Sequence, residues 1–363
     1  MHILFIHTIG KNKYGGGERW VIKAASGLAG RGHDVTVGGR GGSVLLAEAE
    51  KRGVKTHTFN ILSNLSIYQA FRIARYIRKN KIDVVFTKGR DQLVSGLAAR
   101  WGGASLVLKR SGLPPSGKSK KNMFLTRKFV DGIVTNTHSI EKIYHQMGFT
   151  EPGFVKVIYN GLEINKACEP YDFTSKFPGR TMVMCLGRLV ASHKGYFFLL
   201  DAISEIKKQF PQLLFFIVGE GKDKQRLIDY AREKGVDEMV HFEGYVHDPS
   251  PYLKACDFFV HASLYEGMPN AAMEAMAYGK PVIMTRVNGA EELSNNGQFA
   301  YLIPPFDSSA IAEALKFAMG NPEDFKITGE KAKTFVRQKF GMETMVTQLQ
   351  AFIEQRMQVK KNK

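Results

Sequence analysis

Two glutamates, eight residues apart, are the side chains in this sequence with the clearest capacity for chemistry. Glu266 precedes Gly267, Met268, Pro269 and Asn270, and Glu274 follows one turn further on. Pro269 suits the start of a helix, and the backbone amides at a helix N-terminus favour an anion. Two carboxylates beside a phosphate site need separate roles, one on ribose hydroxyls and the other near a sugar that develops positive charge. The alternative is an exposed glutamate beside an ordinary helix cap.

A second segment places Arg188 and Lys194 in one loop after a predicted strand. An arginine can bind a diphosphate bidentately, and a lysine can bind it as a point charge. The spacing of this segment is not that of a P-loop. Basic residues at strand ends are common, so the prediction of a diphosphate clamp depends on the companion segment around Glu266.

Glycine-rich turns follow further predicted strands. Gly15, Gly16 and Gly17 come after the first strand and would let the backbone approach a ligand closely. The turn is not GxGxxG, and no acidic residue stands where NAD ribose would need one, which argues against a dehydrogenase. Gly219 and Tyr245 end strands of the second half, where they could contribute to a base pocket.

The absence of other motifs narrows the chemistry. The chain has no Asp-x-Asp pair, which disfavours a divalent metal held on a diphosphate by carboxylates. It has no GxSxG motif, and its three cysteines show no metal-ligand spacing. We therefore expect no metal and no cofactor, and Arg188, Lys194 and helix dipoles would meet the charge of a departing diphosphate.

The elements that must position these residues alternate short apolar runs with longer helical stretches. Strands that are apolar throughout are typical of parallel sheets covered on both faces. The predicted strands form two series, at 3–6, 34–37, 84–87, 105–108, 132–135 and 155–158, and then at 182–186, 214–218, 240–242, 258–261 and 282–285. The fold class is therefore α/β, with two doubly wound Rossmann-like domains at 1–165 and 166–345. The remaining segment, 346–363, is a helix expected to cross back to the first domain.

The net charge of +17 is confined to the first half of the chain. Residues 1–166 hold 27 of the 51 Lys and Arg but only 10 of the 34 Asp and Glu, and the rest of the chain is balanced. Such asymmetry points to an anionic partner for that half rather than to general solubility. We expect a membrane surface and no nucleic acid, because motifs for nucleic-acid binding are lacking.

Two basic segments would make the membrane contact, which lysines and arginines strengthen through anionic headgroups while apolar residues insert. The first is a helix at 67–81, with Ile67, Phe71, Ala74 and Ile77 recurring along it. The second is a loop that leads into a helix near Phe124. The alternative is that this segment makes no membrane contact and is an ordinary surface loop before a helix packed in the core. The basic residues expected at the membrane are Arg72, Arg75, Arg78, Lys118, Lys120 and Lys121.

Taken together, these motifs resemble glycosyltransferase family 4, whose members are retaining nucleotide-sugar enzymes of the GT-B fold, with two domains facing across a cleft. The match runs from Gly15 through Lys194 to the paired-glutamate segment. By that resemblance, Arg188 and Lys194 hold the diphosphate, Glu274 holds the ribose and Glu266 contacts the donor sugar. Gly16 would face the phosphate from the first domain, and the backbone near Tyr245 and Val246 would read the base.

One departure from the family pattern lies after the fourth strand, where many relatives carry a histidine close to the donor sugar. Here the chain has Arg110, which would take over part of that role or mark a different donor orientation. His138 lies nearby, and we expect it to be structural rather than part of the site.

The resulting expectation is a metal-independent retaining hexosyltransferase that uses a UDP-sugar and a membrane-associated glycan or lipid acceptor in cell-envelope polysaccharide or lipopolysaccharide biosynthesis. The cysteines, the absence of a signal peptide and the absence of a spanning segment predict a cytoplasmic location, peripheral to the inner face of the cytoplasmic membrane. The alternatives are a GT-B sugar-nucleotide epimerase, an inverting transferase, or an inactive membrane- or polyanion-binding protein on the same scaffold.

Overall fold

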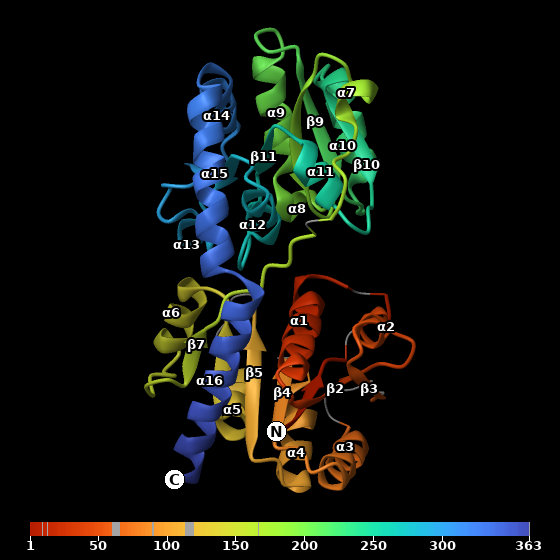
Figure 1. Ribbon diagram of the computed structural model, residues 1–363, viewed down its shortest axis with the longest axis vertical. Helices are drawn as coiled ribbons and strands as arrows, with labels where there is room; N and C mark the ends of the chain where they lie inside the picture. The colour runs from red at the N-terminus through yellow and green to blue at the C-terminus, as the bar shows by residue number, and fades with distance from the viewer. Residues whose placement is uncertain are drawn as a thin grey trace. The chain divides into compact units, whose positions relative to one another are not determined.

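The protein forms two compact units, seen in the computed structural model of Figure 1. The structure describes residues 1–8, 10–12, 14–59, 66–88, 91–112, 120–165 and 167–362. The first unit comprises residues 1–161 and 340–363, and the second comprises residues 162–339. The boundaries differ by a few residues from those expected at 165 and 345. Gly161 belongs to the first unit, where its carbonyl oxygen accepts a hydrogen bond from Lys23 Nζ at 2.6 Å. Phe340 also belongs to the first unit, and the centre of its ring lies 4.6 Å from that of Tyr159.

The first unit is built on a parallel sheet, which among the described residues has seven strands in the order β3-β2-β1-β4-β5-β6-β7. Strands β1 and β4 lie at its centre and are buried almost throughout, as their apolar sequences require. The strands are β1 (His2–Ile6), β2 (Asp34–Gly39), β3 (Lys55–Thr58), β4 (Val84–Lys88), β5 (Leu106–Ser111), β6 (Gly132–Thr135) and β7 (Val155–Val157).

Helices cover both faces of this sheet. Trp20 of one helix packs edge-on against Phe5 and Phe86 of the central strands, and Ile73 and Ile77 of another are fully buried on the opposite face. The helices are α1 (Gly16–Gly30), α2 (Val44–Lys51), α3 (Ile67–Lys79), α4 (Gln92–Gly102), α5 (Lys120–Phe129), α6 (His138–Gln146) and α16 (Met342–Lys361). Helix α16 packs against α1, with Leu349 and Phe352 in the core of the first unit, so the chain ends on the unit where it begins.

The second unit has a parallel sheet of six strands, counted over its described residues, in the order β10-β9-β8-β11-β12-β13. The strands are β8 (Thr181–Leu186), β9 (Leu213–Val218), β10 (Val240–Gly244), β11 (Phe258–His261), β12 (Val282–Thr285) and β13 (Tyr301–Ile303). The longer helices are α9 (Tyr196–Ile206), α10 (Lys224–Glu233), α12 (Asn270–Ala277), α14 (Ser308–Gly320) and α15 (Pro322–Lys339). The shorter ones are α7 (Phe173–Lys176), α8 (Ala191–Lys194), α11 (Ser250–Ala255), α13 (Ala290–Ser294) and the 3₁₀ turn Asp237–Met239.

Two strands, β3 and β13, were not predicted from the sequence. Strand β3 reads Lys-Thr-His-Thr and lies at a sheet edge with its ends exposed, so it lacks the apolar run that marks the other strands. Strand β13 has only three residues and also lies at an edge. No helix in the described part of the chain is long and apolar enough to cross a membrane.

Candidate active site

Glu266 lies just beyond the carboxyl end of β11, and three side chains converge on one of its oxygens. Oε1 is ion-paired with Lys194 Nζ, accepts a hydrogen bond from Ser263 Oγ at 3.0 Å and lies 3.3 Å from His261 Nε2. The carboxylate is mostly buried, with a side-chain exposure of 16%. His261 ends β11, Lys194 ends α8 and Ser263 lies between strand and glutamate, so parallel-sheet topology brings these groups to one edge.

The environment keeps this carboxyl group ionised. Burial alone would raise the pKa of Glu266, but His261 and the positive charge of Lys194 lower it to about 2. Burial lowers the pKa of His261, which favours the neutral imidazole at neutral pH. The site therefore presents one carboxylate and one ammonium group beside a neutral histidine.

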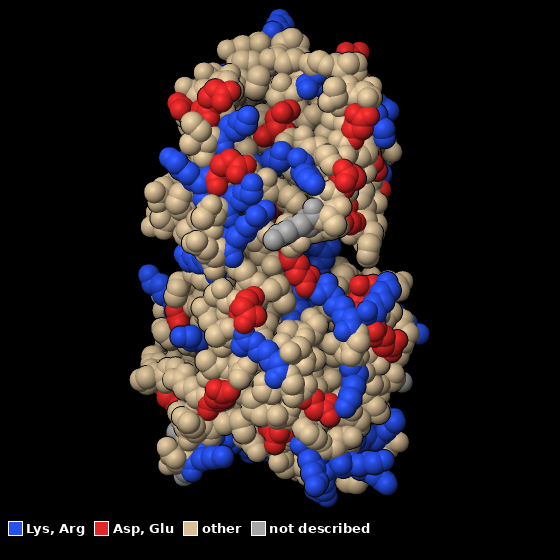
Figure 2. Space-filling view, in the orientation of Figure 1, with Lys and Arg blue, Asp and Glu red and all other residues tan. Residues whose placement is uncertain are grey.

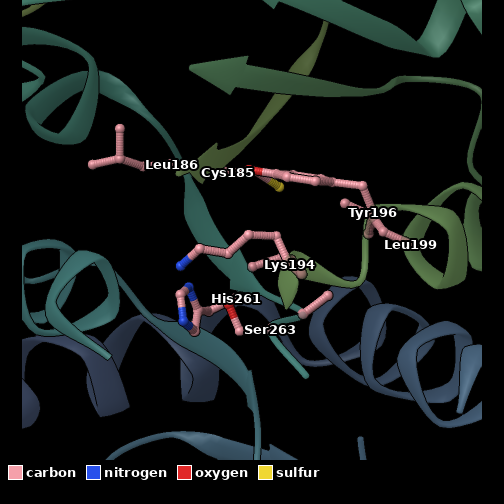
Figure 3. Close-up of a pocket in the computed structure, with 9 residues that line it drawn as sticks. Cys185, Leu186, Lys194, Tyr196, Leu199, His261 and Ser263 are labelled. Atoms are coloured by element: carbon pink, nitrogen blue, oxygen red, sulfur yellow. The ribbon is translucent and has the colours of Figure 1, made fainter. Parts of the chain in front are cut away.

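The loops that carry these groups pack backbone against backbone. Gly195 has φ +62°, and a Cβ atom there would overlap the carbonyl oxygen of Ala262. Gly219 has φ +148°, and a Cβ atom there would overlap the carbonyl oxygen of Gly187. Only glycine allows these two approaches, which hold the 187–195 loop against the loops after β9 and β11. A small hollow between them is lined by Lys194, Tyr196, His261 and Ser263, among others (Figure 3).

The other predicted donor-site residues of the paired-glutamate segment lie next to Glu266. Helix α12 begins at Asn270 with Pro269 as its N-cap, one residue later than a proline in the first turn would place it. Gly267, Met268 and Pro269 are buried, whereas Glu274 is half-buried and lies one turn inside the helix.

Arg188 lies in the loop after β8 but is not in contact with Glu266. Its side chain is exposed, and no described residue forms an ion pair with it. Just after β10, which lies two strands from β8 in the sheet, Tyr245 is 66% exposed and Val246 is half-buried. The exposed Arg188 and Tyr245 are therefore open to a ligand.

In the first unit, the glycine-rich turn is closed by its own glutamate. The N–H of Gly15 donates to Glu18 Oε2 at 2.8 Å, and Glu18 Oε1 lies 2.5 Å from His7 Nε2 and 3.7 Å from Lys88 Nζ. Burial opposes ionisation, but His7 and Lys88 lower the pKa of Glu18 to about 2. Gly15 and Gly16 remain exposed at the start of α1 and Gly17 is half-buried, so the turn can meet a ligand.

Arg110 and His138, the remaining first-unit candidates, have different environments. Arg110 is the next-to-last residue of β5, is 7% exposed and donates through Nη2 to Asn160 Oδ1 at 2.8 Å. His138 is exposed at the start of α6, with Nδ1 2.8 Å from Oε2 of Glu141 on the same helix.

The predicted membrane residues are described in part. Arg72, Arg75 and Arg78 are exposed on α3, and Phe124 is 60% exposed on α5. Figure 2 shows basic side chains gathered over the α3 region of the first unit. Lys118 lies outside the described residues, and of Lys120 and Lys121 only the backbone, in α5, is described.

The apolar face of α3 differs from the expected one. The sequence pattern grouped Ile67 and Phe71 with Ala74 and Ile77. In the structure, Ile67 is 68% exposed, Phe71 is 63% exposed and the neighbouring Tyr68 is 69% exposed. The buried positions are Ala70, Ile73, Ala74 and Ile77, which follow the helical spacing and pack on the sheet. The helix thus carries apolar side chains on both its core face and its exposed face.

Sequence reasoning missed Glu18 and its neighbour His7 in the first unit. In the second unit it missed His261 and Ser263, which contact Glu266. His7 follows the first strand and His261 ends β11, and a polar residue that closes an otherwise apolar strand was the available signal. Glu18 directly follows the three glycines of the predicted turn, and the sequence analysis assigned no role to it.

Family models match both units. The family model described as "Glycosyltransferase Family 4" matches residues 14–166, and the model described as "Glycosyl transferases group 1" matches residues 180–321. The chain is 27% identical over 311 residues to the lipopolysaccharide core biosynthesis glycosyltransferase LpsE of Rhizobium meliloti, which covers 84% of this chain and 85% of the relative. It is 26% identical over 284 residues to a Campylobacter jejuni N-acetylgalactosaminyltransferase that acts on a diphospho-undecaprenol-linked sugar, covering 74% of this chain and 75% of the relative.

A solved structure has the same fold. The Anabaena protein Alr3699/HepE, crystallised in complex with UDP, superposes with a TM-score of 0.86 at 22% identity, covering 98% of this chain and all of that one. The likeness extends through both parallel sheets, so it includes the strand ends that carry the residues described above.

Proposed function

Because the chain belongs to glycosyltransferase family 4 and has the two Rossmann-like sheets of the GT-B fold, we propose that it transfers a sugar from a UDP-sugar to a hydroxyl group of a membrane-associated glycan or lipid, with retention of anomeric configuration. One relative is a glycosyltransferase of lipopolysaccharide core biosynthesis, another transfers N-acetylgalactosamine to a diphospho-undecaprenol-linked sugar, and the structural neighbour HepE was crystallised with UDP. The observation that carries the proposal is the ionised Glu266 in contact with Lys194 at the carboxyl edge of the second sheet.

The donor would bind with its diphosphate at Lys194 and Arg188. Lys194 is half-buried and ion-paired with Glu266, whereas Arg188 is exposed. The backbone at the start of α12, residues 267–270, would add the positive end of the helix dipole. Glu274 would hold the ribose, and the backbone near Tyr245 and Val246 would contact the base.

The reaction follows from where the charges lie. The bond between the anomeric carbon and the β-phosphate oxygen breaks, which leaves positive charge on the sugar and negative charge on UDP. The Glu266 carboxylate stabilises the sugar, and Lys194 with Arg188 stabilises UDP. The acceptor oxygen attacks the same face that UDP leaves, and its proton passes to the departing phosphate oxygen. The products are the glycoside with its configuration retained and protonated UDP.

We propose that this charge neutralisation requires no divalent metal. Lys194 and Arg188 would meet the charge of the departing diphosphate in place of a metal ion. If EDTA abolishes turnover and Mg²⁺ or Mn²⁺ restores it, this part of the proposal is wrong.

The acceptor would be reached from an anionic membrane surface. The exposed Ile67, Tyr68 and Phe71 on α3 lie among Arg72, Arg75 and Arg78, which combines insertion with attraction to headgroups. This arrangement supports a peripheral location on the inner face of the cytoplasmic membrane.

The deciding experiment is a panel of UDP-sugars tested for thermal stabilisation and then for slow hydrolysis in the absence of acceptor. We expect UDP and at least one UDP-sugar to raise the melting temperature. NMR of the first released sugar should show the anomer of the donor. Release of the opposite anomer would indicate an inverting enzyme, and a donor sugar of changed configuration would indicate an epimerase. A protein that binds no nucleotide would fit the remaining alternative, an inactive membrane- or polyanion-binding protein.

A further inference from the structure

Arg110 is a buried cation without an anionic partner. The residue is 7% exposed, and its Nη2 donates a hydrogen bond to the neutral amide oxygen of Asn160. Its Nε and Nη1 atoms are buried and have no hydrogen-bond partner. No carboxylate in the described part of the first unit lies within ion-pair distance of the guanidinium. A buried charge in this state is costly unless something else pairs with it.

The neighbours of Arg110 add a second unpartnered donor. The guanidinium lies 4.7 Å from the ring of Trp20 in α1, and Nε1 of that buried indole also has no hydrogen-bond partner. Gly112 packs directly over the guanidinium, because a Cβ atom there would lie 3.3 Å from Nη1. Two neighbouring side chains, one from α1 and one from β5, therefore carry buried donors that have no acceptor.

The charges at this edge of the sheet do not supply the missing anion. Lys88 ends β4 in register with Arg110, and its Nζ lies 3.7 Å from Glu18 Oε1. Glu18 is already engaged by His7 and by the N–H of Gly15. Burial lowers the pKa of Arg110 to about 9, which still leaves it charged at neutral pH. A water molecule could accept from the N–H groups but would not compensate the charge.

We propose that Arg110 and Trp20 bind a phosphate group of the acceptor at the carboxyl edge of the first sheet. This inference rests on the proposed function, since an acceptor linked to a lipid through phosphate brings such a group. The phosphate oxygens accept from Nε and Nη1 of Arg110 and from Nε1 of Trp20, and their charge pairs with the guanidinium. The backbone at Gly112 shifts to admit them. Arg110 acts as a positioning residue that fixes the acceptor while its hydroxyl reacts.

The test is calorimetric titration of the full-length protein with inorganic phosphate, with and without saturating UDP. Phosphate should bind in both conditions, and Arg110→Gln should weaken that binding at least tenfold. Arg110→Lys, which keeps the charge with fewer donors, should fall between the two. Arg232→Gln, an exposed arginine on α10 of the second unit, is the matched loss of charge and should change nothing.

Tryptophan fluorescence gives an independent readout, because Trp20 lies against the proposed site. Phosphate should shift the emission of the wild type and not that of Arg110→Gln. Equal binding by the wild type and Arg110→Gln would overturn the proposal, as would sodium acetate binding as tightly at the same ionic strength. Loss of the Arg110-dependent binding when UDP is present would assign the site to the donor phosphate and overturn the acceptor assignment.

These outcomes separate the inference from the proposed function. A protein that binds and hydrolyses a UDP-sugar but shows no Arg110-dependent phosphate binding loses the inference alone. A protein that binds no nucleotide loses the proposed function, whereas the titration without UDP still decides whether Arg110 binds phosphate.

Discussion

His261 Nε2 lies 3.3 Å from Glu266 Oε1, the same oxygen that contacts Lys194 and Ser263. The hydrogen bonds and ion pairs that described residues make with this carboxylate all use Oε1. The three neighbours hold the carboxylate in one orientation and one charge state. The site is thus arranged before any donor binds, as electrostatic stabilisation of a transition state requires.

Replacement of Glu266 by glutamine should preserve its shape and remove its charge. We expect turnover of the UDP-sugar to fall by about 10²- to 10³-fold, because a group aimed at developing charge acts mainly in the transition state. The affinity for UDP should change little, since UDP lacks the sugar. Glu313→Gln on α14, an exposed glutamate paired with Lys316, is the control. Unchanged turnover in Glu266→Gln would contradict the proposed mechanism.

Replacement of Lys194 should weaken the binding of the diphosphate and leave the binding of the nucleoside unchanged. In Lys194→Gln we expect the affinity for UDP to fall about 10- to 100-fold, the usual loss for a charge-assisted hydrogen bond. The affinity for uridine, measured by the same calorimetry, should stay the same. Lys222→Gln, an exposed lysine in the loop after β9, should leave both affinities unchanged. An equal loss for uridine and UDP would place Lys194 away from the phosphates.

Gly195 should tolerate no side chain. It has φ +62°, and an alanine Cβ would overlap the carbonyl oxygen of Ala262, so the loop that carries Lys194 would have to move. Gly195→Ala should therefore destabilise the second unit and lower the affinity for UDP at least tenfold. Gly179→Ala, at φ +74° with open space around it, should cost only about 1 kcal/mol of stability for the left-handed backbone. Thermal melts with and without UDP compare the two variants.

The sequence was sufficient to predict both sheets and the segments that carry the site. Long apolar strands such as β1 and β9 are buried on both faces, and that burial leaves a continuous apolar run in the sequence. Strand β3 could not be predicted, because an edge strand with exposed ends needs no such run. The same limit applies to Ile67 and Phe71, whose helical spacing fits either face of α3.

The contacts within the site could not be predicted, because they depend on which strand ends are neighbours. Lys194 and Glu266 are 72 residues apart and meet because β8 and β11 pair in the sheet. Likewise, the guanidinium of Arg110 meets the neutral amide of Asn160, 50 residues away, rather than a carboxylate. Residue types and loops follow from the sequence, whereas their pairing follows from strand order.

The lowered pKa of Glu18 should make the stability of the first unit depend on pH. The pKa in the folded state is about 2 against an ordinary 4.5, so the charged group stabilises the fold above pH 4.5, and this stabilisation is lost as the pH falls towards 2. A shift of this size corresponds to about 3 kcal/mol for a buried group. Glu18→Gln should lower the free energy of unfolding by about that amount at pH 7, and the difference should shrink below pH 4.5.

Urea denaturation followed by tryptophan fluorescence measures this change, because the two tryptophans, Trp20 and Trp101, both lie in the first unit. Glu50→Gln at an exposed position of α2 controls for the loss of one carboxylate. A difference between Glu18→Gln and the wild type that stays constant from pH 7 to pH 3 would show that Glu18 is not the group responsible.

Helix α3 should bind anionic membranes through both its charges and its exposed apolar side chains. Sedimentation with vesicles containing phosphatidylglycerol should fall steeply as salt rises from low to physiological concentration, because the headgroup attraction is screened. The triple change of Arg72, Arg75 and Arg78 to Gln should weaken binding about 100-fold at low salt, at about 1 kcal/mol for each charge. A second triple variant changes the apolar residues Ile67, Tyr68 and Phe71 to Ser. It should reduce the binding that remains at high salt, since insertion does not depend on screening.

The matched control changes three basic residues of the second unit to Gln, namely Arg226, Arg232 and Lys234. Binding that is unaffected by salt and by both sets of changes on α3 would place the membrane contact elsewhere or rule it out.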